Sequence, residues 1–163
     1  MRYWFDTEFI EDGRTIDLLS IGIVAEDGRE FYAENNEADL SRGVDWVQHN
    51  VIVHLDWLNH GMTRDKLRDG VLQFISEYPI TVGPTKPEFW AYYADYDWVA
   101  LCQLFGTMMD LPKGWPMYCR DVKQLCDDLG NPLLPERGEG EHHALADARW
   151  TRDAWSFLQN IKS

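Results

Sequence analysis

Three runs of strand-type sequence stand close together at the start of the chain and constrain its fold more than any other feature. Residues 2–9 are rich in aromatic side chains, residues 15–25 form a β-branched run, and residues 29–34 follow a Glu-Asp-Gly turn. Connections this short join neighbouring antiparallel strands. We therefore predict an antiparallel meander of three strands.

The apolar residues that follow the meander have a helical spacing. They recur at three- and four-residue steps and predict a helix over residues 64–78, with Thr63 as its N-cap and Pro79 as its stop. Residues 88–93 predict a further strand. The apolar faces of three later helices are Trp98, Leu101, Cys102, Phe105, Met108 and Met109; Val122, Leu125, Cys126 and Leu129, closing at Gly130; and Leu145, Ala148, Ala154, Trp155, Leu158 and Ile161. This order predicts an α/β fold with a mixed central sheet flanked by helices.

The charge balance limits the surfaces that this chain can offer to nucleic acid. Its 163 residues fit one domain over 1–163, and 28 acidic against 15 basic side chains give a net charge of −13. Such a protein has no broad electrostatic footprint for duplex DNA. This counts against a sequence-specific DNA binder and requires any nucleic-acid contact to be local or mediated by bound cations.

The cysteine count and the apolar runs indicate a cytoplasmic protein. Three cysteines are an odd number without metal-type spacing, so we expect reduced thiols rather than a disulfide framework. No apolar run approaches the roughly 18 residues that a membrane span needs. The acid at position 6, Asp6, interrupts the apolar stretch that a signal peptide would require.

The first predicted strand carries two acidic residues, Asp6 and Glu8, two positions apart. Side chains alternate along a strand, so both carboxylates project from the same face. Two acids among aromatic residues repel one another and resist desolvation unless a cation lies between them. Hard oxygen ligands of this kind suit Mg²⁺ or Mn²⁺. The alternative is an edge strand that exposes both acids to water.

A second acidic segment stands where the strand over residues 88–93 meets the next helix. Loops at strand ends are where α/β folds place their chemistry, and an acid there can face the neighbouring strand. Asp97 stands at the start of a helix whose apolar face begins at Trp98, so its carboxylate can point back over the sheet. Asp95 is typical of an N-cap or a solvated acid. The alternative is that both acids only cap the helix.

A third group opens the last helix with the sequence Glu-His-His-Ala-Leu-Ala-Asp. We expect His142 at the mobile entrance of this helix and Asp147 in its second turn, one residue from the core position Ala148. A single histidine near a helix start is more often a surface residue than a catalyst. The acid five residues later, and the glycines at 138 and 140 in the approach, favour a functional role for His142.

Together the three groups follow an order that resembles the DEDDh 3′-to-5′ exonucleases, whose fold is ribonuclease H-like. The order is Asp-x-Glu on a first strand, Asp at a central strand-to-helix junction and His-x4-Asp near the carboxyl end. The stretches YWFDTEFIEDG, LLSIGIVAEDGREFYA, WAYYADYDWVALCQL and HHALADAR are similar to a small bacterial 3′-5′ exoribonuclease family related to ribonuclease T and oligoribonuclease. The resemblance covers nearly the whole chain, and three ordered motifs are far more specific than one.

The resemblance implies roles for individual residues. His142 matches the general base, whereas His143 is one residue too close to Asp147 to do so. Ala94 stands where many members have Asn, which leaves Asp95 as an alternative ligand. The four acids that bind two divalent cations, Mg²⁺ or Mn²⁺, in this family match Asp6, Glu8, Asp97 and Asp147.

The implied substrate is the single-stranded 3′ end of RNA, and the implied assembly is a homodimer. In this family the terminal nucleotide contacts the positions that match Thr7, Glu8 and Phe9. Ordinary strand packing is the alternative for Thr7 and Phe9. Aromatic side chains can stack on bases without using charge. The tryptophans considered for this role are Trp46, Trp57 and Trp90, although eight tryptophans in so short a chain are mostly core.

The implied reaction is the metal-dependent removal of nucleoside 5′-monophosphates from RNA 3′ ends. Two cations can stabilise both the nucleophilic water and the leaving 3′ oxygen, while neutral His142 takes the proton of the water. A DNA 3′-5′ exonuclease stays open, because no residue identifies a 2′-hydroxyl contact. A non-catalytic nucleic-acid-binding module on the same fold is the second alternative. A zinc site made by the three cysteines and His143 matches no common spacing.

Overall fold

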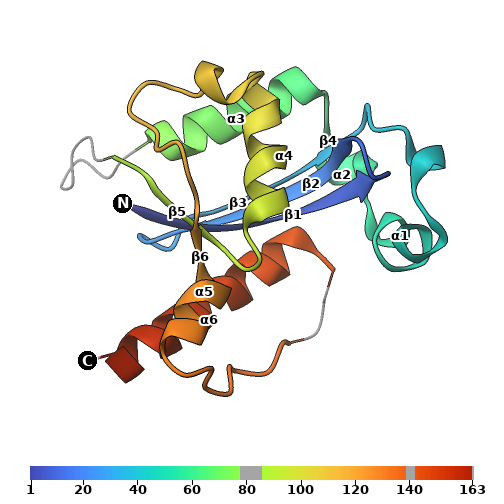
Figure 1. Cartoon of the computed structure of the whole chain (residues 1–163). Coiled ribbons are helices and arrows are strands. Elements are labelled where there is room, and N and C mark those ends of the chain that lie inside the picture. The colour runs from blue at the N-terminus through green and yellow to red at the C-terminus, as the bar shows by residue number, and fades with distance from the viewer. Residues whose placement is uncertain (78–85, 139–141, 163) are drawn as a thin grey trace.

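The computed structural model describes residues 1–77, 86–138 and 142–162 (Figure 1). These residues contain a six-stranded sheet in the order β4-β3-β2-β1-β5-β6. The strands are β1 (Arg2–Glu11), β2 (Ile16–Ala25), β3 (Glu30–Asn35), β4 (Gly61–Met62), β5 (Glu88–Ala91) and β6 (Arg120–Asp121). β1 pairs antiparallel with β2, and β2 with β3, which confirms the predicted meander. β5 runs parallel to β1, so the sheet is mixed as expected.

Helices cover both faces of this sheet (Figure 1). Helices α3 (Arg64–Ser76) and α4 (Asp95–Phe105) lie on one face, and α5 (Val122–Asp128) and α6 (Ala144–Lys162) lie on the other. Successive side chains of β1 pack alternately against the helices of the two faces, as strand geometry requires. Tyr3 and Phe5 are buried with α3 and α4, whereas Trp4 packs with α5 and α6. The α/β fold with helices on a mixed sheet is confirmed.

The helix predicted over residues 64–78 is α3. Its N-cap is Thr63, whose side chain accepts a hydrogen bond from the N–H of Lys66. Tyr78 and Pro79, the expected end of this helix, lie outside the described residues. No helix in the described ranges is long and apolar enough to cross a membrane.

Helix α4 is shorter at its end than its apolar pattern predicts. Gly106 adopts a left-handed φ of 121° and ends the helix at Phe105. Met108 and Met109, predicted as part of its buried face, lie instead in a short 3₁₀ helix over Met108–Asp110, and both are exposed. The prediction was wrong here because a glycine with positive φ interrupts a pattern that spacing alone would continue.

The segment between β3 and α3 consists of elements too short to show a period in the sequence. They are a 3₁₀ turn at Leu40–Arg42, α1 (Asp45–Asn50), a 3₁₀ turn at Ile52–His54, α2 (Trp57–His60) and the two-residue strand β4.

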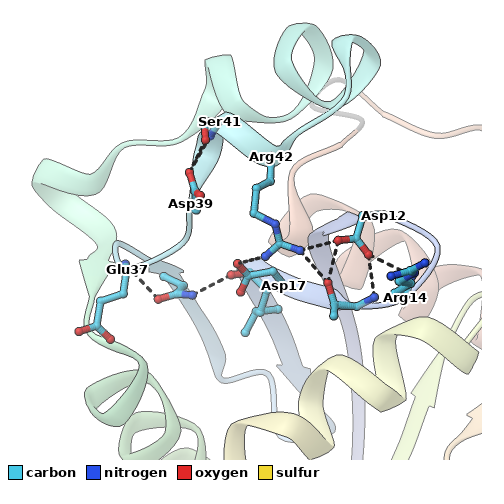
Figure 2. Close-up of polar contacts among 10 residues, drawn as sticks. Asp12, Arg14, Asp17, Glu37, Asp39, Ser41 and Arg42 are labelled. Carbon is cyan, nitrogen blue, oxygen red and sulfur yellow. Dashed lines mark hydrogen bonds and ion pairs between the residues drawn. The ribbon is translucent and has the colours of Figure 1, made fainter.

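Arg42 joins this segment to the β1–β2 hairpin (Figure 2). Its guanidinium donates to Asp12 Oδ2 at 2.7 Å and to the Thr15 hydroxyl at 2.6 Å, and lies 3.6 Å from Asp17 Oδ2. Asp12 in turn accepts the backbone N–H groups of Arg14 and Thr15. These contacts hold α1 at the end of the sheet where β1 ends (Figure 1).

Candidate active site

Three of the predicted site residues meet in one carboxylate cluster. Carboxylate oxygens of Asp6, Glu8 and Asp147 lie within 4.8 Å of one another. Asp6 and Glu8 come from one face of β1, as the alternation predicts, and Asp147 comes from α6. Within the described ranges no other group of three acidic, histidine or cysteine side chains is close enough to hold an ion. The zinc alternative from the three cysteines and His143 therefore has no support in the described part of the chain.

Gly22 of β2 allows α6 to reach this cluster. Asp6 pairs with Gly22 in the strand ladder. A Cβ on Gly22 would lie 2.3 Å from the backbone N of Leu145 and 2.4 Å from the carbonyl carbon of Ala144, so only glycine fits. The helix begins at Ala144, which places Asp147 in its first turn and not in the second as predicted. This close approach sets the acid of α6 beside the two acids of β1.

We expect Gly22→Ala to push the first turn of α6 away from the sheet. Overpacking of this kind lowers the free energy of unfolding by about 1–3 kcal/mol. Chemical denaturation measures the loss. Gly138→Ala is the matched control, because nothing lies within 4 Å of a Cβ there. Equal stabilities of the two variants would contradict the proposed role of Gly22.

Asp97 lies next to the cluster but outside it. It lies in the first turn of α4 and is only 6% exposed. Its Oδ1 accepts the backbone N–H of Thr7 at 2.8 Å and the Thr7 hydroxyl at 2.6 Å. Thr7 stands between Asp6 and Glu8, so these two bonds fix the position of Asp97 relative to both acids. Asp97 is not within the group of three, but its charge acts on both acids of β1.

Asp95 differs from Asp97 in its surroundings. Its side chain is exposed, and it belongs to no ligand group in the described part of the chain. The N-cap of α4 is Ala94, which makes no side-chain cap. The alternative that Asp95 and Asp97 only cap the helix is therefore not supported.

Burial and mutual repulsion disfavour the charged forms of the carboxyl groups in the cluster. Burial, and then the neighbouring carboxylates, raise the pKa of Glu8 to about 8 and that of Asp6 well above its usual range. Burial also raises the pKa of Asp97 to about 6, against the two hydrogen bonds from Thr7. A site made only of carboxylate oxygens that repel one another fits hard divalent cations such as Mg²⁺ or Mn²⁺.

The raised pKa of Glu8 predicts how stability depends on pH without added metal. Glu8 titrates near 4.5 in the unfolded chain and near 8 in the folded one, so between these values the folded protein binds more protons. The free energy of unfolding should therefore fall as pH rises through this window. We expect urea denaturation in EDTA to show lower stability at pH 8 than at pH 5. Glu8→Gln should flatten this slope, and an unchanged slope in that variant would contradict the assignment.

The two neighbouring histidines have different contacts. The backbone N–H of His142 donates to Asp147 Oδ2 at 3.0 Å, and its backbone has a left-handed φ of 67°, which is uncommon for a residue other than glycine. Its ring meets the ring of Trp46 edge-on, with centroids 4.8 Å apart. The His143 ring instead stacks on Tyr32 at 4.3 Å. His142 thus lies between α1 and the start of α6, while His143 packs against the sheet.

The aromatic residues considered for substrate contact fall into two groups. Trp90 is buried and donates its indole N–H to Glu88, so it belongs to the core, and Trp57 is partly buried. Trp46 is exposed and contacts His142. Phe9 stacks on the exposed Tyr96 with ring centroids 5.6 Å apart. Trp46 therefore adjoins the site through His142, and the Phe9–Tyr96 pair adjoins it because Phe9 follows Glu8 and Tyr96 precedes Asp97 in the chain.

A family comparison fits this geometry. Residues 1–159 match the family described as the 3′-5′ exoribonuclease Rv2179c-like domain. The chain belongs to this family of 3′-5′ exoribonucleases. The sequence resemblance that pointed to a small bacterial exoribonuclease family is thereby confirmed.

Curated relatives support the same assignment. The chain is 45% identical over 149 residues to the 3′-5′ exoribonuclease Rv2179c of Mycobacterium tuberculosis strain H37Rv, and the match covers 91% of this chain and 88% of the relative. The same figures hold for the 3′-5′ exoribonuclease MT2234.1 of strain CDC 1551. These relatives identify an exoribonuclease enzyme.

A solved structure supports the fold. It is described as "3'-end specific recognition of histone mRNA stem-loop by 3'-exonuclease", with a TM-score of 0.56 and 14% identity. The match covers 97% of the present chain and 64% of the chain in the solved structure. At this identity the likeness concerns the fold alone.

Two further residues, Asp121 and Arg137, support the site and are not among the residues that the sequence predicts. Asp121 accepts the N–H groups of Tyr93 and Ala94 at 3.2 and 3.4 Å, and so holds the turn that leads into α4. It also caps α5, and an acid before the apolar run at Val122 is the signal that could have found it. Arg137 contacts Asp147, and no local pattern marks it.

Proposed function

We propose that this exoribonuclease hydrolyses RNA with two divalent cations, Mg²⁺ or Mn²⁺, held by its carboxylate cluster. The observation that carries the proposal is the convergence of acids from β1 and α6 within 4.8 Å, with Asp97 beside them. The ligands proposed are Asp6, Glu8, Asp97 and Asp147. Bound there, the cations would stabilise the charge that develops on the attacking water and on the leaving 3′ oxygen.

His142 is the proposed general base. A neutral imidazole can accept the proton of the attacking water, and its place beside Asp147 at the start of α6 sets it at the edge of the cluster. The edge-on contact with Trp46 limits the orientations of the ring. The proposed products are nucleoside 5′-monophosphates.

The proposed substrate is the single-stranded 3′ end of RNA, contacted by Thr7, Glu8 and Phe9. The stacked Phe9–Tyr96 pair offers an aromatic edge beside the site that can contact a base without using charge. Thr7 is buried, and both its N–H and its hydroxyl bond to Asp97. Its larger contribution is therefore to position Asp97.

We expect Thr7→Val to weaken metal binding. The change removes the hydroxyl that bonds Asp97 and keeps the size of the side chain, and lost support of a ligand typically costs about 10- to 100-fold in metal affinity. Calorimetric titration with Mn²⁺ measures the change. Thr15→Val is the control, because the Thr15 hydroxyl bonds Arg42 away from the cluster. Equal affinities of Thr7→Val and wild type would remove the positioning role.

The activity is tested with one RNA sequence and its DNA counterpart, labelled at the 3′ or the 5′ end. We expect 3′-labelled RNA to release a labelled mononucleotide at once, and 5′-labelled RNA to shorten stepwise. EDTA should stop both reactions, and Mg²⁺ or Mn²⁺ should restore them. Activity that persists in EDTA would exclude the metal centre. Faster hydrolysis of DNA would favour the alternative of a DNA 3′-5′ exonuclease.

We also infer the wider organisation of the protein. One exonuclease domain over residues 1–163 is supported by the family match to residues 1–159 and by the shared sheet. A homodimer is expected from the resemblance to ribonuclease T and oligoribonuclease, and sedimentation velocity tests it. A cytoplasmic location is supported by the unpaired cysteines Cys102, Cys119 and Cys126.

A further inference from the structure

Arg137 is a basic side chain that faces the carboxylate cluster. Its Nη1 donates to Asp147 Oδ1 at 2.5 Å, and the Asp147 side chain is only 8% exposed. Its positive charge lowers the pKa values of both Asp6 and Glu8, against the burial and repulsion that raise them. Arg137 therefore offsets part of the negative charge that the acids of β1 and α6 bring together.

Two aromatic rings support the guanidinium of Arg137. Its Cζ lies 4.2 Å from the ring centroid of Trp150 and 5.7 Å from that of Tyr92. The indole N–H of Trp150 donates to the carbonyl of Pro135 at 2.9 Å, which anchors the chain just before Arg137 to α6. In this position over the rings the guanidinium still donates to Asp147. The guanidinium can thus change its polar partner without leaving these rings.

Open space adjoins this guanidinium. A cavity of about 450 Å³ is lined by Arg137, Tyr92, Trp150 and residues 131–134. Leu133 in this lining is 93% exposed, so the cavity opens to solvent. An anionic group could reach Arg137 through this opening.

The proposed metal centre and the ion pair of Arg137 compete for the same carboxylate. A divalent cation on Asp147 would neutralise the carboxylate charge that now attracts Arg137 and would repel the guanidinium, so it would weaken this charge-assisted bond. Once Asp147 binds an ion, Arg137 needs another anion. A guanidinium matches a phosphate with two parallel N–H···O bonds, and an RNA chain brings a phosphate for each nucleotide.

We propose that Arg137 exchanges Asp147 for a phosphate of the bound RNA, one linkage or more upstream of the scissile one, and is thus a substrate-binding residue. This inference rests on the proposed metal function of the cluster. It implies that ions and RNA bind with positive coupling, because occupation of Asp147 by an ion frees the guanidinium for the phosphate.

The first test measures ion binding without RNA. Calorimetric titration with Mn²⁺ compares wild type, Arg137→Gln and Arg149→Gln. Arg149 is the matched control, since it is an arginine of α6 that pairs with Glu30 and not with the cluster. We expect Arg137→Gln to bind ions as tightly as wild type or more tightly. A weaker affinity in Arg137→Gln would mean that Arg137 supports Asp147 as a ligand, and would overturn the exchange.

The second test locates the phosphate. RNAs carry one uncharged methylphosphonate linkage at each of the first few positions upstream of the scissile bond, and kcat/KM is measured for the first cleavage. At one position the neutral linkage should lower the kcat/KM of wild type by about 10- to 100-fold, the range for losing a hydrogen bond to a charged group. On ordinary RNA, Arg137→Gln should have a kcat/KM that is lower than that of wild type by about the same factor, and the neutral linkage should lower it no further. The kcat/KM of Arg137→Lys on ordinary RNA should lie between those of wild type and Arg137→Gln.

The outcomes separate this inference from the proposed function. If every neutral linkage costs Arg137→Gln as much as wild type, the phosphate contact does not exist, even though ion binding is intact. If wild type itself binds no Mn²⁺, the metal centre fails and the exchange fails with it. Unchanged kcat/KM in Arg137→Gln on ordinary RNA would also overturn the proposal, whereas Arg149→Gln should match wild type throughout.

Discussion

Asp6→Asn should abolish RNA hydrolysis and at the same time stabilise the protein in EDTA. Burial and three neighbouring carboxylates raise the pKa of Asp6, so its charge opposes folding when no ion is added. The amide removes this charge and also removes a proposed ligand. In wild type, free metal at about 100 times its dissociation constant should add roughly 2.7 kcal/mol per site to the free energy of unfolding. Thermal melts in EDTA and in Mg²⁺ should show Asp6→Asn losing most of this gain.

Asp95→Asn is the control for Asp6→Asn. Its exposed carboxylate lies near the same helix start but outside the cluster, so activity and the metal-induced shift should persist. Loss of both properties in Asp95→Asn, with Asp97→Asn unaffected, would reassign the second motif. A lower melting temperature of Asp6→Asn in EDTA would contradict the electrostatic account of the cluster.

His142→Ala should lower kcat by about 10²- to 10⁴-fold and leave ion binding nearly intact. A general base contributes about this much to the rate. The contact of His142 with Asp147 is made by its backbone N–H, which alanine retains, so the carboxylate keeps that partner. Single-turnover kinetics and Mn²⁺ calorimetry measure the two effects separately.

His143→Ala is the matched change one residue away. It removes the stack on Tyr32, and an aromatic pair is worth about 0.5–1.5 kcal/mol of stability. At a temperature where both variants are folded, it should keep most of the wild-type kcat. Equal losses from the two histidine changes would show that the turn acts as a scaffold and that the base is assigned wrongly.

Local sequence patterns predict most of the fold. The meander follows from β-branched and aromatic runs joined by short turns, and α3 follows from its period and its Thr63 cap. Patterns fail where structure depends on a backbone angle or on short elements. Gly106 stops α4 before Met108, and the elements between β3 and α3 are each too short to show a period.

Local patterns likewise predict only part of the candidate site. Alternation alone places Asp6 and Glu8 on one face of β1. The position of Asp147 beside them depends on Gly22, which lies in another strand and is recognisable only once α6 is packed against it. Arg137 reaches the cluster from a segment without regular structure, so neither its bond to Asp147 nor its contact with Trp150 leaves a mark in the sequence.

Anomalous diffraction from crystals soaked in Mn²⁺ tests the central claim most directly, because it locates ions without reference to activity. We expect two anomalous peaks roughly 3.5–4 Å apart, within bonding distance of the carboxylates of Asp6, Glu8, Asp97 and Asp147. Well-ordered crystals that take up Mn²⁺ elsewhere, with no peak among these four carboxylates, would contradict the account.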